Sequence, residues 1–70
     1  MNIEIFFLGQ SATLQDVLSI ERVSDSVTAF NFPPEVEVPA WEDLPEEWHP
    51  HLDISANGMS IDGQIQFKKN

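Results

Sequence analysis

Residues 52–61 have the sequence LDISANGMSI, in which apolar and polar side chains alternate on both sides of the pair Asn57-Gly58. Alternation with a period of two is typical of a half-buried strand, and both residues of the pair tolerate the positive φ that a tight hairpin turn demands. Asp62-Gly63 predicts a second turn or bulge before the alternation resumes. We therefore expect short antiparallel strands in this part of the chain.

Residues 1–32 show the same preference for strands. Ile3, Ile5 and Phe7 share one parity, which predicts a strand, and Gly9 ends it. The chain thus has a β region at each end.

The conformation of residues 13–23 has two interpretations. In the first, Val17–Val23 pairs with Val27–Phe32 as a hairpin, which the aromatic and β-branched side chains of the second strand favour. In the second, a helix covers residues 13–23, because Leu14 and its apolar neighbours follow helical spacing for one turn. The helical pattern fails one turn later, at acidic residues, so the hairpin is our first interpretation.

All five prolines lie within residues 33–50, which we name the acidic segment. Proline cannot donate a hydrogen bond to a sheet, so this segment forms no sheet interior. Glu35–Val38 alternates and predicts an edge strand. Leu44–Trp48 predicts one helical turn with Asp43 as its cap.

The expected fold is mainly β, as a single domain over residues 1–70. It is a small antiparallel sheet of about four or five short strands, closed in a barrel- or sandwich-like unit. The acidic segment, with its helical turn, is inserted between the two β regions. The alternative is an α+β fold with the helix at 13–23.

The composition excludes several classes of site and partner. With 70 residues, three Lys/Arg, twelve Asp/Glu and no cysteine, the chain has a formal charge of −9 at pH 7. Without cysteine there is no disulfide, cysteine-bound zinc or thiol nucleophile. Phosphate backbones and anionic lipids repel such a charge, so we expect no direct nucleic-acid or membrane partner and favour a basic protein surface. Residues 1–8 lack the basic lead and the apolar length of a signal peptide, which predicts a cytoplasmic location.

The acidic segment is the strongest candidate for a functional site. Its six carboxylates are interleaved with two tryptophans, and it contains no Lys or Arg. Carboxylates steer and orient a basic partner, while an indole supplies desolvated contact area. The expected partner-contacting residues are Glu35, Glu37, Trp41, Glu42, Asp43, Glu46, Glu47, Trp48 and Asp53. The alternative interpretation is a solvated loop whose tryptophans fold back onto the core.

Metal binding and catalysis have less support in the sequence. His49 and His51 flank Pro50, and on an extended chain their imidazoles point to the same side, which makes them weak candidate metal ligands. Their spacing matches no compact zinc motif, so no cofactor is expected. No serine lies in a nucleophile elbow and no glycine-rich phosphate loop is present, so no catalytic residue is assigned and no enzyme is expected.

Three functions follow from these observations, in decreasing order of preference. The first is a non-catalytic protein-binding module, an inhibitor or neutralising partner that occupies a basic surface of another protein, for example one that otherwise binds nucleic acid, where carboxylates stand in for phosphates. Small phage-type antagonists share this size and charge, which is an analogy only. The second is a structural subunit joined by sheet-edge pairing through Ile3–Leu8 or Val27–Phe32. The third is a metal-dependent binder centred on His49 and His51.

Overall fold

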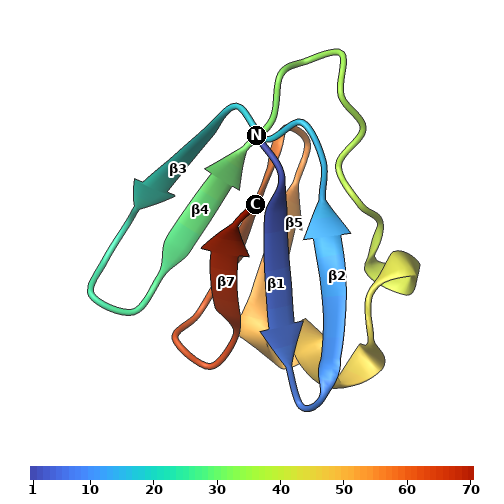
Figure 1. Cartoon of the computed structure of the whole chain (residues 1–70), viewed down its shortest axis with the longest axis vertical. Coiled ribbons are helices and arrows are strands. Elements are labelled where there is room, and N and C mark those ends of the chain that lie inside the picture. The colour runs from blue at the N-terminus through green and yellow to red at the C-terminus, as the bar shows by residue number, and fades with distance from the viewer.

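The computed structural model describes residues 1–70 and has seven β-strands and two short 3-10 helices (Figure 1). In chain order the elements are β1 (Ile3–Phe7), β2 (Gln10–Leu14), β3 (Ser19–Arg22), β4 (Thr28–Asn31), η1 (Trp41–Asp43), η2 (Glu46–His51), β5 (Leu52–Ser55), β6 (Gly58–Ile61) and β7 (Gln66–Lys69). Neither helix has the length and apolar character needed to cross a lipid bilayer. The mainly β fold predicted from the sequence is confirmed, with more strands than expected.

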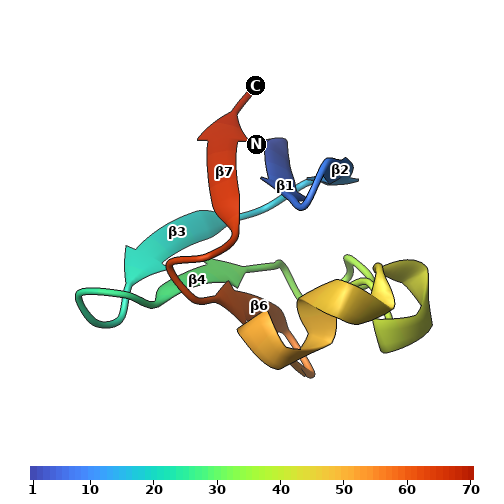
Figure 2. The same cartoon turned by 90° about the horizontal axis from the view of Figure 1, so that it is seen from below.

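The strands form two antiparallel sheets, one with the order β2-β1-β7 and the other with the order β3-β4-β6-β5. Figure 2 shows them as two layers, with β1, β2 and β7 on one side and β3, β4 and β6 on the other. The two 3-10 helices lie at the end of these layers that is remote from β3 (Figures 1 and 2). The acidic segment therefore occupies one side of the molecule.

The core lies between the two sheets. Strand alternation buries Ile3 and Ile5 of β1, Phe30 of β4 and Ile61 of β6. The rings of Phe30 and Phe67 meet edge to face with 5.3 Å between centroids, which joins β4 to β7 and so one sheet to the other. Burying an aliphatic or aromatic side chain of this size stabilises a fold by roughly 2 kcal/mol. The strand parities predicted from the sequence are those that supply this core.

The expected hairpin in the N-terminal half is present, and the helix at 13–23 is not. β3 pairs with β4, with Ser19 opposite Asn31 at one end and Arg22 opposite Thr28 at the other. The helical alternative is wrong because β2 extends to Leu14 and Asp16 adopts a φ of 60°, which no right-handed helix contains. In this stretch Leu14 is buried from β2 and Val17 from the irregular connection to β3, whereas Leu18 and Val23 are exposed.

Two details of the predicted strands differ from the structure. Glu35–Val38 forms no edge strand, because the Val36 N–H donates to the Pro33 carbonyl at 3.0 Å in a turn and the surrounding prolines interrupt any ladder. The β5–β6 turn consists of Ala56 and Asn57, and Gly58 is the first residue of β6. A Cβ at Gly58 would lie 3.1 Å from the Phe30 carbonyl oxygen, so glycine serves the close approach of β6 to β4.

The strands expected to offer a free edge are both interior. β1 pairs with β2 on one side and β7 on the other, and β4 lies between β3 and β6. The expectation that Ile3–Leu8 or Val27–Phe32 joins an assembly by edge pairing is therefore wrong, since their backbone groups are used within this chain. The open edges belong to β2, β7, β3 and β5.

Candidate functional site

The inner side of the acidic segment is anchored by Trp48. Its side chain is completely buried, and the indole Nε1 donates a hydrogen bond of 3.1 Å to the Phe7 carbonyl oxygen at the end of β1. Leu44 is also buried, and Val36 and Val38 pack against the core. Trp48 was expected to contact a partner, but its burial excludes that role in the folded protein. Its place in the sequence could not show this, because the acceptor of its indole N–H lies on β1, far away along the chain.

Trp41 is the exposed tryptophan of the acidic segment. Its side chain is 38% exposed, at the start of η1. His49 Nε2 lies 2.8 Å from the Trp41 carbonyl oxygen, and because a carbonyl only accepts, this nitrogen is the donor. The two rings meet edge to face with 5.1 Å between centroids. The imidazole thus holds the outer indole in one place from the neighbouring helix.

The six carboxylates of the acidic segment are all exposed and none forms an ion pair. Two of them make local hydrogen bonds: Asp43 Oδ2 accepts from the Ala40 N–H at 3.1 Å, and Glu47 Oε2 accepts from Gln10 Nε2 at 3.2 Å. Asp43 therefore caps η1 and not the later turn for which it was predicted. The remaining four carboxylates make no polar contact within the chain. They are those of Glu35, Glu37, Glu42 and Glu46.

Asp53 lies apart from these carboxylates. It sits on β5 opposite Ser60 and is exposed. Its surroundings are those of the outer face of the four-stranded sheet, where Ala29 and Ser60 line the same depression. Asp53 is therefore on a strand of the four-stranded sheet, whereas the other predicted site residues belong to the acidic segment.

The two histidines do not form a shared metal site. Residues 49–51 belong to the 3-10 helix η2, so the extended geometry assumed for His49 and His51 is wrong. His49 contacts Trp41, whereas the His51 Nδ1 donates to Asp62 Oδ2 at 2.8 Å. No group of three or more His, Cys, Asp or Glu side chains is gathered closely enough to hold a metal ion.

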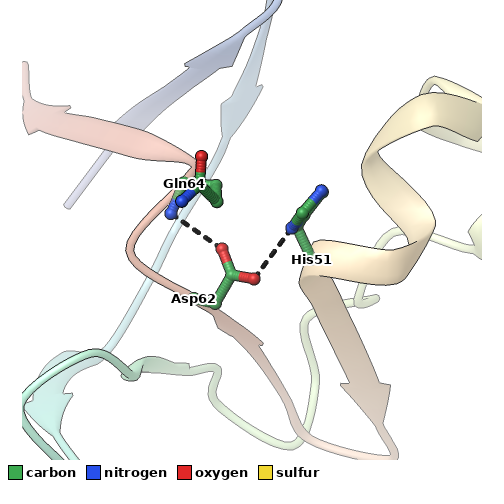
Figure 3. A network of polar contacts seen from close by, with 3 residues as sticks. All are labelled: His51, Asp62 and Gln64. Carbon is green, nitrogen blue, oxygen red and sulfur yellow. Dashed lines mark hydrogen bonds and ion pairs between the residues drawn. The ribbon is translucent and has the colours of Figure 1, made fainter.

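Asp62 joins the end of η2 to the β6–β7 connection, as Figure 3 shows. Its Oδ1 accepts the Gln64 backbone N–H at 2.8 Å, while Oδ2 accepts from His51. Burial acts to raise the pKa of Asp62, but the hydrogen bonds from His51 and from the Gln64 and Ile65 amides, together with the charge of His51, bring this pKa below its usual value. The sequence marked Asp62-Gly63 only as a turn, and the pairing with His51 required the fold.

A second feature without a sequence prediction is the β1–β2 turn. Leu8 and Gly9 both have positive φ, of 54° and 78°, and the Leu8 side chain is 64% exposed. Two-residue hairpin loops require this conformation, but leucine pays a steric penalty in it that glycine and asparagine avoid. The turn lies beside an open hollow of about 370 Å³ lined by residues 6–11 and two glutamines. Of the two non-glycine residues with positive φ, Leu8 and Asp16, the leucine is the less suited to this conformation.

No protein-family model, curated protein or solved structure matches this chain.

Proposed function

We propose that this protein is a small, non-catalytic binding module whose acidic segment docks on a basic surface of another protein. In the simplest form it is an inhibitor that occupies a surface used for nucleic acid, with carboxylates in the place of phosphates. The observation that carries the proposal is the exposed Trp41 indole, held by His49 and followed directly by carboxylates that have no cation within the chain.

The electrostatics of the chain support a basic partner. Among twelve Asp/Glu side chains only Asp62 and Glu4 have an ion-pair partner, and the three Lys/Arg lie on β3 and β7. Uncompensated carboxylates accelerate association with a positive surface and fix its orientation. Trp41 adds an aromatic contact that gains energy when it is desolvated, and cation–π contact with Lys or Arg adds to it.

The two other functions, a subunit joined by sheet-edge pairing and a metal-dependent binder, lose their specific support. The strands offered for edge pairing are interior, and the two histidines have separate partners. The proposal includes a cytoplasmic location, which is compatible with a chain that has no cysteine to oxidise.

The test compares two double charge reversals with the same change in net charge. Glu42→Lys with Glu46→Lys alters the acidic segment, at side chains that make no polar contact. Glu21→Lys with Asp25→Lys is the matched control on and beside β3, where both side chains are exposed and the Arg22 guanidinium uses only the Asp25 backbone carbonyl.

A basic partner is captured from native lysate, and its affinity for each variant is measured by calorimetry at low and high salt. We expect binding that weakens with salt, is lost in the acidic-segment variant and is retained in the control. Equal affinity of the two variants for the partner would show that this segment is not the interface.

A further inference from the structure

An open groove separates the acidic segment from the edge of β5. It has a volume of about 500 Å³, and its walls are residues 34–40 on one side and Ile54, Ser55 and Ala56 on the other. Val36, Val38 and Ile54 give it apolar surface that is continuous with the core. Grooves of this volume are within the range of protein ligand sites.

The β5 wall of the groove presents unpaired backbone groups. β6 is the only strand beside β5. The Asp62 N–H donates to the His51 carbonyl at 2.9 Å, and Ser55 stands opposite Gly58 next to the two-residue turn. Because hydrogen-bonded and non-bonded positions alternate along an antiparallel pair, the N–H and C=O of Ile54 point away from β6. An edge of this kind accepts a further strand.

The chain does not fill that position itself. Residues 35–38 pass along the groove, but the Val36 N–H is used in a turn to Pro33 and no backbone hydrogen bond joins this stretch to β5. Pro34 and Pro39 lie at either end of the groove wall. The outward backbone groups of β5 are therefore not paired with another strand of this chain.

The charge of the groove selects its occupant. Glu35 and Glu37 line it, are exposed and have no ion-pair partner, and no Lys or Arg is among its lining residues. A second copy of β5 would bring like charges together, which disfavours pairing. A strand whose side chains alternate between apolar and basic would place one set against Val36, Val38 and Ile54 and the other beside the carboxylates.

We propose that an extended segment of the partner, with Lys or Arg at alternate positions, binds in this groove as an added strand on β5. This inference rests on the proposed function and names the part of the partner that the acidic segment receives. It also gives the module two contacts on one side, the groove for a strand and Trp41 for a side chain.

The experiment uses a short synthetic peptide in which Val and Lys alternate, added to the isotopically labelled full chain. Amide hydrogen exchange and chemical shifts are followed by NMR. We expect the Ile54 amide to become protected by about tenfold or more. The same peptide with N-methyl groups on alternate residues keeps its charge but cannot complete the ladder, and we expect it to bind at least about tenfold more weakly. A Val/Glu peptide is the charge control, and we expect it not to bind.

A variant gives a second, independent measurement. Ile54→Pro removes the outward N–H while leaving the β5–β6 hydrogen bonds, as edge strands tolerate, and we expect it to bind the Val/Lys peptide as weakly as the wild type binds the N-methylated one. The peptide comparison does not depend on this variant folding.

The outcomes separate the two proposals. If Ile54 stays unprotected, or if the N-methylated peptide binds equally well, while the Trp41 indole and the amides of Glu42, Glu46 and Glu47 shift, the added strand is overturned and the proposed function stands. If no signal shifts at low salt, the added strand is overturned, and the charge-reversal comparison alone decides the proposed function.

Discussion

Trp48 and Phe7 are joined by a hydrogen bond from the indole Nε1 to the backbone carbonyl at 3.1 Å, with the indole completely buried. This contact attaches the acidic segment to β1. Trp48→Phe removes the donor and part of the packed volume, so we expect the free energy of unfolding to fall by about 2–3 kcal/mol, measured by urea denaturation. Trp41→Phe is the matched control at an exposed position and should stay within about 0.5 kcal/mol of wild type. Equal effects of the two changes would contradict the anchoring role.

Leu8 occupies a backbone conformation that suits other residues better, with a φ of 54°. Leu8→Asn creates the preferred residue pair for a tight hairpin turn, and we expect it to stabilise the protein by about 1 kcal/mol. Leu8→Ala removes the exposed side chain but keeps the strain, and it should bring no such gain. Thermal denaturation of the three proteins distinguishes relief of strain from removal of apolar surface.

Gly58 and Gly63 form a second matched pair. A Cβ at Gly58 would meet the Phe30 carbonyl oxygen at 3.1 Å, whereas at Gly63 the nearest atom, the Ser26 carbonyl oxygen, is 3.9 Å away. We expect Gly58→Ala to destabilise the fold by about 1–3 kcal/mol, because β6 must move from β4. Gly63→Ala should be neutral or slightly stabilising, since it restricts the unfolded chain. A Gly58→Ala protein as stable as wild type would show that β6 can shift away from β4 without loss of stability.

The lowered pKa of Asp62 predicts how the stability of the fold changes at acid pH. The pKa of this carboxylate is lowered in the folded protein, so its contribution to stability is fully present above the unfolded value and is lost as the pH falls through the folded value. Asp62→Asn removes that contribution. We expect the variant to be less stable than wild type near about pH 5, with the difference shrinking toward about pH 2. The carboxylate is partly exposed, so the difference should stay below about 1 kcal/mol. A constant difference across this range would contradict the titration of Asp62 as its cause.

Much of the fold follows from local patterns in the sequence. The parities of β1, β4 and β5 predicted which side chains are buried, because a two-sheet core selects alternate residues on each strand. Gln10–Leu14 gave no such signal, since only Leu14 of its five side chains is buried. Its strand character comes from pairing with β1.

The site was predicted less completely than the fold. The acidic segment was recognised from its charge, but the choice between Trp41 and Trp48 depends on a long-range contact, the hydrogen bond from the Trp48 Nε1 to the Phe7 carbonyl 41 residues away along the chain. The groove beside β5 was not predicted either, because it exists only where Glu35–Val38 fails to form the strand that its alternation suggested. Tertiary contacts, and not local preference, decide both features.

The division between one enclosed and one outward-facing indole gives the unlabelled protein two distinct fluorophores. Trp48 emission should report unfolding, because its environment changes only when the core opens. Trp41 emission and its quenching by acrylamide should report whatever covers the acidic segment. The two single-tryptophan variants therefore report separately on the occupancy of that surface and on the integrity of the domain.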